Sequence, residues 1–196
     1  MQKILVTTFV SLLSLNAFAQ TEIAAVSSIQ SEATIKISKN KRRCKYFSAS
    51  APVTMADGSV KSIAEVRVGE HVKTCKDGRS AVTQVKQIDV YNQPNSSLTA
   101  VYLRPVEESK TGETPIVPAL LLEATPHHMV QTNRGRKRMK KLSKNDILYH
   151  YEPATGIVSS WKVGAVKENA RRVSRAYNLE TEEGTYLIDN VMVANN

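Results

Sequence analysis

The chain has 196 residues and an excess of basic over acidic side chains, 27 against 18, so its formal net charge is +9. This length is enough for one domain with its own hydrophobic core and excludes a small scaffold that depends on disulfides. The two cysteines and four histidines lack the spacing of metal ligands. We therefore expect neither a metal nor a cofactor.

The first residues have the pattern of a secretory signal. Residues 1–3 are cationic, residues 4–15 are mostly apolar, and Ala17 and Ala19 supply the small residues before a cleavage site. We predict a signal peptide over residues 1–19 and export to the periplasm or the extracellular space. No later segment approaches about 18 uninterrupted apolar residues, so no transmembrane segment is expected.

The segment 20–43 is polar, and its first half is rich in Ser and Thr. We interpret it as a leader or linker, followed by one domain over residues 44–196. Cys44 and Cys75 are the only cysteines, and an exported protein can keep a disulfide between them. The sequence does not establish that their Cα atoms come close enough for that bond.

From residue 47 onward, short β-branched runs alternate with turn signals such as Asp57-Gly58 and Asp77-Gly78. Runs at roughly 8–12-residue spacing are typical of an all-β domain. We predict strands at residues 53–55, 60–63, 70–74, 81–90, 98–103, 116–124, 147–150, 158–166, 174–181, 186–188 and 191–193. The only helical turn expected is a short one within residues 61–66.

Three segments, in order, resemble the conserved blocks of the Hint family, the self-processing domains of hedgehog proteins and inteins. The first is YFSASAPVTMADGSVKSIAEVRVGEHV (46–72), and the second is LLEATPHHMV (121–130), which contains a Thr-x-x-His and is followed by LSKNDIL. The third, AYNLETEEGTYLIDNVMVANN (176–196), is similar to the closing hairpin. The resemblance spans about 150 residues. It implies an all-β, Hint-like fold of short strands with pseudo-twofold hairpins.

The resemblance also implies a chemistry. In this family a thiol at the first position of the domain attacks the preceding carbonyl and turns the peptide bond into a thioester. The His of Thr-x-x-His protonates the leaving amine, and the Thr hydroxyl polarises the amide. These roles are carried over to Thr125 and His128, with Cys44 as the candidate nucleophile. His127 is interpreted as a surface residue, because adjacent residues of a strand face opposite sides.

The register of the nucleophile is open. Gapless alignment on Val53 and the Asp-Gly turn places Tyr46 at the family's cysteine position, and a phenol is a poor nucleophile for this acyl shift. Cys44 lies two residues earlier, on the same side of an extended strand but about 6–7 Å away. A bulge or a longer connecting loop would bring it into register. Otherwise the site has lost its nucleophile, and Cys44 is a disulfide partner of Cys75 or an inert thiol.

The closing residues argue against splicing. Inteins end in His-Asn before a Cys, Ser or Thr, whereas this sequence has Asn195 and Asn196 and no residue after them. An Asp in the closing block of many inteins is replaced by Asn178. Cleavage at the N-terminal side of the domain is then the only family reaction we expect.

Two basic segments, residues 39–45 and 134–141, are candidates for binding an anionic surface. The cations of the second are Arg134, Arg136, Lys137, Arg138, Lys140 and Lys141. Neither segment carries aromatic residues for base stacking, so we do not expect a nucleic-acid partner. The simplest interpretation is a charged linker and a solvated loop.

Three functional hypotheses follow. In the first, the domain processes itself: a thioester forms at Cys44 with help from Thr125 and His128, and the leader is released. In the second, a degenerate Hint domain acts as an exported binding or structural module. In the third, the basic protein binds anionic surface polymers.

Overall fold

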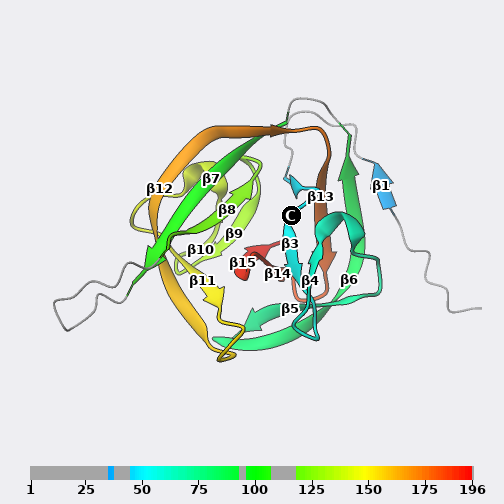
Figure 1. Cartoon of the computed structure of the whole chain (residues 1–196), viewed down its shortest axis with the longest axis horizontal. Helices are drawn as coiled ribbons and strands as arrows, with labels where there is room; N and C mark the ends of the chain where they lie inside the picture. The colour runs from blue at the N-terminus through cyan, green and yellow to red at the C-terminus, as the bar shows by residue number, and fades with distance from the viewer. Residues whose placement is uncertain (1–34, 38–44, 93–95, 107–117, 196) are drawn as a thin grey trace, which may run out of the picture. The chain divides into compact units, whose positions relative to one another are not determined.

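The structure is a computed structural model in which residues 35–37, 45–92, 96–106 and 118–195 are described, the side chains of 35–37 and Ser96 excepted (Figure 1). All of these residues belong to one compact unit, Ala33–Asn196. The predictions for the signal peptide, most of the leader and Cys44 lie outside the described residues.

The described residues form strands and two short 3-10 turns, with no α-helix among them. The strands are β1 (Ile35–Ile37), β2 (Phe47–Ser48), β3 (Pro52–Thr54), β4 (Val60–Ser62), β5 (His71–Lys76), β6 (Arg79–Tyr91), β7 (Ser96–Pro105), β8 (Leu120–Ala124), β9 (Met129–Thr132), β10 (Gly135–Arg138), β11 (Ile147–Tyr151), β12 (Val158–Val173), β13 (Ala176–Thr181), β14 (Thr185–Ile188) and β15 (Val191–Ala194). The 3-10 turns are η1 (Ile63–Glu65) and η2 (Met139–Lys141). Within this part of the chain no helix has the length and apolar character needed to cross a membrane.

The strands form two curled sheets. One has the order β1-β6-β13-β2, with β5 also paired to β6, and the other has the order β4-β3-β14-β15-β11-β12-β7-β8, with the β9–β10 hairpin joined to β15. In Figure 1 the long strands β12 and β7 curve around one side and β6 around the other, while β14 and β15 lie in the middle. Register shifts in the β12–β7 ladder interrupt the pairing of these long strands, and such shifts bend a strand.

Two hairpin turns show why the local sequence folds in this way. Asp77 and Gly78 link β5 to β6 with positive φ angles of 52° and 73°, and Asp189 and Asn190 link β14 to β15 with 49° and 59°. A two-residue turn with positive φ at both positions matches the twist of the strands, and Asp, Asn and Gly adopt it most easily. The Asp-Gly signal in the sequence is therefore confirmed as a turn.

One hydrophobic core joins the two sheets. Phe47, Ile63, Leu179 and Tyr186 are among its members, and all four are almost fully buried. Phe47 comes from β2, the short strand that carries the chain into the domain. Burial of this side chain holds the start of the domain inside the fold rather than on its rim.

All eleven predicted strands overlap observed strands, and the turn predicted within residues 61–66 is η1. The segment 134–141, interpreted as a loop, instead forms β10 and η2. Gly135, the first residue of β10, has φ of 90°, and Thr132 Oγ1 donates to Gly135 O at 2.7 Å, so the chain reverses and pairs with β9. β1, inside the predicted leader, pairs in parallel with β6.

Candidate functional site

The Thr-x-x-His motif forms a tight turn between β8 and β9. The His128 backbone N–H donates to Thr125 O at 3.0 Å, which closes the turn. Pro126 stands at the second position, where its fixed φ favours such a turn. Thr125 and His128 are 1% and 0% exposed. The surface position expected for His127 assumed a strand here, whereas the turn leaves His127 only partly exposed.

Backbone bonds from η2 hold this turn from behind. The Met139 N–H donates to His128 O at 2.9 Å, and the Lys140 N–H donates to Pro126 O at 3.0 Å. Met139 itself is fully buried. The basic segment therefore contributes to the position of His128, a structural role that its charge pattern did not reveal.

Thr125 forms two hydrogen bonds with Tyr46. The Tyr46 N–H donates to Thr125 Oγ1 at 2.7 Å, and the Thr125 N–H donates to Tyr46 O at 2.8 Å. The Tyr46 nitrogen belongs to the peptide bond between Lys45 and Tyr46. The Thr125 hydroxyl therefore binds the nitrogen of that peptide bond.

His128 lies beside the same peptide bond. Burial lowers the pKa of its imidazole to about 4, an interaction with the Lys45 backbone opposes this shift, and the Lys45 ammonium adds to it. Neither ring nitrogen has a hydrogen bond of ordinary length and angle to a described residue. The ring packs edge-on against Phe47, with centroids 4.2 Å apart. His128 is thus neutral at pH 7.

We call Lys45, Tyr46, Thr125 and His128 the Lys45–Tyr46 site. The structure brings Thr125 and His128 together on one peptide bond, as the resemblance implied. It does not place Cys44, which lies outside the described residues, and the catalytic roles of these side chains remain predictions.

The Tyr46 side chain points into a small buried cluster. Its ring stacks on Tyr91 with centroids 5.4 Å apart and an interplanar angle of 11°, and Ala176 packs beside them. Tyr46 is only 7% exposed. Stacking of this kind fixes the ring, so the phenol oxygen is held at the far end of a rigid, packed group.

Asn178 lies close to the site across the sheet. Phe47 of β2 pairs with Tyr177 of β13, so continuing the register by one pair sets Tyr46 opposite Asn178. The Asn178 side chain is fully buried; its Oδ1 accepts from the Tyr186 hydroxyl at 3.2 Å, and its Nδ2 has no partner among the described residues. Burial raises the pKa of Tyr186 far above its ordinary value, so this hydroxyl stays protonated and donates.

The side chain of Asn195 is fixed by two hydrogen bonds to Thr181. Its Nδ2 donates to Thr181 O at 2.8 Å, and its Oδ1 accepts from Thr181 Oγ1 at 3.2 Å. Asn196 lies outside the described residues.

Cys75 is a buried free thiol in the part of the chain that the structure describes. It lies in a second hydrophobic cluster with Tyr151, Leu187 and Met192. Burial raises the pKa of its thiol to about 11. Because its predicted partner Cys44 is not among the described residues, the bridge stays a prediction.

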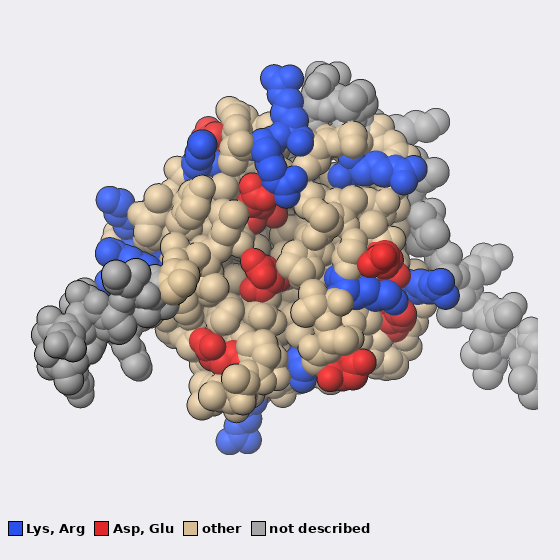
Figure 2. Space-filling model, in the orientation of Figure 1, with Lys and Arg blue, Asp and Glu red and all other residues tan. Residues whose placement is uncertain are grey.

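The basic segment keeps most of its charge in solvent. Lys137 is the exception, since its Nζ pairs with Asp146 Oδ2 at 2.6 Å. The exposed cations are Arg134, Arg136, Arg138, Lys140 and Lys141. On the face shown in Figure 2, Lys and Arg side chains lie at several separate places, some beside acidic side chains, and not as one continuous patch.

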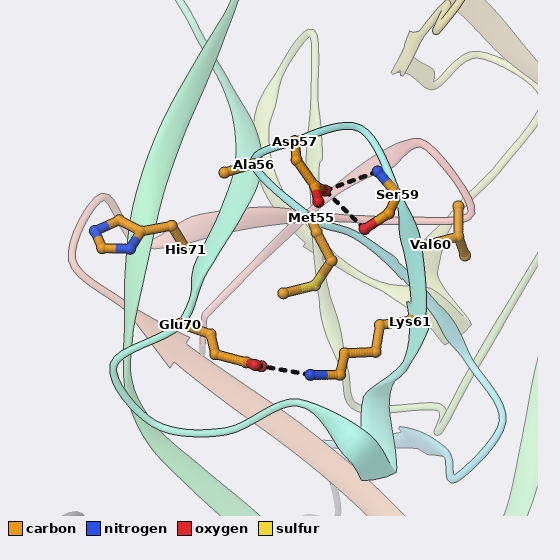
Figure 3. A pocket seen from close by; sticks show the side chains of 8 residues that line it. All are labelled: Met55, Ala56, Asp57, Ser59, Val60, Lys61, Glu70 and His71. Atoms are coloured by element: carbon orange, nitrogen blue, oxygen red, sulfur yellow. Dashed lines mark hydrogen bonds and ion pairs between the residues drawn. The ribbon is translucent and has the colours of Figure 1, made fainter.

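An open pocket of about 450 Å³ lies beside the β3–β4 hairpin, with Met55 and Asp57 in its wall. Figure 3 shows Lys61 and Glu70 paired across it at 2.7 Å. Hydrogen bonds from the Ser59 side chain and backbone hold the pKa of Asp57 below its usual value. None of the residues that line this pocket belongs to the Lys45–Tyr46 site, so the two are separate features.

Among the described residues, no three His, Cys, Asp or Glu side chains are grouped to hold a metal ion.

Comparison with solved structures identifies the fold. The chain is similar to a DnaB intein from Synechocystis, with a TM-score of 0.60, 13% identity, and 77% of this chain and 98% of that chain covered. It is also similar to a bacterial intein-like domain from Clostridium thermocellum, with a TM-score of 0.54, 20% identity and coverage of 78% and 99%. An intein from a hyperthermophile matches with a TM-score of 0.59, 13% identity and coverage of 76% and 99%. No protein-family model and no curated protein matches the sequence. The chain therefore has the Hint fold of self-processing domains, as its three sequence blocks predicted.

Proposed function

We propose that this chain is an exported protein whose Hint-fold domain binds its own Lys45–Tyr46 peptide bond without carrying out the thioester step at that bond. The observation that carries the proposal is the position of Tyr46. Its backbone N–H binds the Thr125 hydroxyl at 2.7 Å, while its ring is stacked on Tyr91. The export part of the proposal rests on the predicted signal peptide at residues 1–19.

The chemistry separates this site into two halves. The half that binds the amide is present, because Thr125 contacts its nitrogen and His128 lies beside the Lys45 backbone. The other half needs a nucleophile on the residue that follows the bond. A phenol oxygen at the end of a rigid ring cannot fold back onto the carbonyl that precedes its own residue. The domain therefore acts as a non-catalytic module that holds its N-terminal segment.

A second candidate function is self-cleavage that releases the leader through a thioester at Cys44. The intact pair of Thr125 and His128 favours it. To act on the bond before Cys44, the chain would have to shift by two residues and remove Tyr46 from its stacked position. Splicing is not part of either proposal, because Asn195 stands where the family has a histidine and its amide is bound to Thr181.

One experiment separates these functions. Residues 20–196 carrying an N-terminal tag are incubated with dithiothreitol, and intact mass is followed for wild type, Tyr46→Cys, Tyr46→Cys/His128→Ala and Cys44→Ala. We expect wild type to stay intact. Tyr46→Cys restores a thiol at the position that follows the bond, so we expect thiol-dependent cleavage after Lys45, which the added His128→Ala change abolishes.

The outcomes are distinct. Wild-type cleavage before Cys44 that is lost in Cys44→Ala would replace the proposal with the second candidate. An inert Tyr46→Cys variant, folded as judged by its circular dichroism, would show that the amide-binding half of the site is not competent either.

A further inference from the structure

The upstream segment of the chain is paired with the domain at a place far from the Lys45–Tyr46 site in sequence. β1 pairs in parallel with β6, and the register joins Ile35 to Ile88, Lys36 to Asp89 and Ile37 to Val90. Figure 1 shows β1 along the outer side of β6, on the side away from β13. β1 belongs to the segment that we interpreted from the sequence as a leader or linker.

The register across this sheet is continuous from the leader to the start of the domain. Ile37 pairs with Val90, Val90 with Tyr177, and Tyr177 with Phe47. β1 therefore lies level with the residues that enter the site, three strand spacings away, or about 14 Å. Both ends of the connection between Ile37 and Lys45 are thus attached to the same sheet.

On the side of β6 away from β13, the backbone groups of Ile88–Val90 are paired by β1. β13 covers one side of Ile88 and Val90, and β5 pairs only with residues 79–84 of β6. Without β1, the other side would present unpaired backbone N–H and C=O groups, which is the kind of edge that recruits another extended chain. Ile88 is 6% exposed and belongs to the core, so this edge is anchored rather than free to move.

We propose that the edge of β6 at Ile88–Val90 is a strand-docking site whose ligand is the chain's own upstream segment, residues 35–37. The site recognises extended backbone by strand addition. The parallel ladder joins the backbone of residues 35–37 to that of residues 88–90. The inference goes beyond the proposed function, because it holds whether or not the Lys45–Tyr46 bond is cleaved.

Attachment through the chain makes this pairing effective. Ile37 is only a few residues from the domain in sequence, and a short tether gives an effective concentration in the millimolar range. A three-residue strand that binds weakly as a free peptide is therefore bound when it is part of the chain. It follows that a separate peptide must be supplied at millimolar concentration, and that it binds only when the edge has been vacated.

Hydrogen–deuterium exchange of residues 20–196 tests the proposal. In the variant Lys36→Pro/Ile37→Pro at least one backbone donor of the ladder is lost, since alternate residues of a strand face opposite edges. The control Lys36→Thr/Ile37→Val keeps both N–H groups and favours a strand. We expect exchange in the fragment covering Ile88–Val90 to rise about tenfold or more in the proline variant and not in the control.

Three further measurements complete the test. Fragments from β12 should exchange equally in all variants. If the proline variant does not fold, Lys36→Gly/Ile37→Gly serves as a milder variant, in which we expect an intermediate rise in the exchange of Ile88–Val90. A peptide of residues 33–40 at millimolar concentration should restore protection of Ile88–Val90 in the proline variant. Equal exchange in wild type, proline and glycine variants, or no protection by the peptide, would overturn the docking site. Neither result bears on the mass measurement that tests the proposed function.

Discussion

Replacement of Thr125 by valine tests the hydrogen bond on which the site depends. Valine has nearly the shape of threonine but no hydroxyl, so Thr125→Val keeps the packing and the backbone bond from Thr125 N to Tyr46 O. It removes the 2.7 Å bond from the Tyr46 N–H to Thr125 Oγ1. Thr125 is 1% exposed and Tyr46 is 7% exposed, so water cannot readily replace the lost acceptor.

The magnitude follows from the donor that is left behind. A buried N–H without an acceptor costs about 1–3 kcal/mol. For a domain of roughly 150 residues, each kcal/mol lowers the melting temperature by about 2–4 °C. We expect Thr125→Val to lower the free energy of unfolding by about 2 kcal/mol in urea denaturation, with an unchanged m value. Thr125→Ser, which keeps the oxygen, should lose less than about 1 kcal/mol.

Thr99 offers a matched control with the opposite sign. It is fully buried on β7, and its hydroxyl has no partner among the described residues. Removal of an unpaired buried hydroxyl is neutral or stabilising, so we expect Thr99→Val to unfold at the same or a higher urea concentration. If Thr125→Val is as stable as wild type, or if both valine variants lose the same free energy, the reasoning about the Tyr46 donor is wrong.

Three further predictions concern titration and reactivity. Burial lowers the pKa of His128 in the folded protein to about 4. The neutral imidazole therefore contributes its full stability above about pH 6.5, and this stability is lost as pH falls towards 4. In denaturation curves measured from pH 7 to pH 4, His128→Gln should remove up to about 3 kcal/mol of this pH dependence. Burial opposes ionisation of Asp146, but its bonds from Lys137 and Ser143 prevail and lower its pKa. The stability that ionised Asp146 contributes is therefore lost only below the pH range in which His128 acts. Asp146→Asn should reduce the fall in unfolding free energy at the acid end of the curve. An unchanged fall would show that the Lys137–Asp146 pair does not cause it. Cys75, with its pKa raised to about 11, should react with a thiol reagent at pH 8 only after denaturation in the Cys44→Ala background; rapid labelling of the native protein would contradict its burial.

Local signals in the sequence identified most of the strands correctly. Asp77-Gly78 predicts a turn because both residues adopt positive φ readily, and the structure has that turn. Alternating β-branched runs predicted β6 and β12, although the structure extends both beyond the predicted ends. The basic composition of residues 134–141 did not predict the strand β10. Its pairing with β9 depends on the turn at Gly135 and on the ion pair of Lys137 with the buried Asp146.

The sequence by itself determined the fold class and the pair Thr125 and His128, because three ordered blocks and a Pro-containing turn are encoded within short stretches of chain. Only the tertiary structure decided which peptide bond this pair faces. The bond from Tyr46 to Thr125 joins residues 79 apart in sequence, and a shift of two residues would keep the same side of the strand towards the site, so no local pattern could choose the register. Burial of Phe47 and the stacking of Tyr46 on Tyr91 settled it. The pairing of β1 with β6 was hidden for the same reason, because backbone pairing between distant segments leaves little trace in composition.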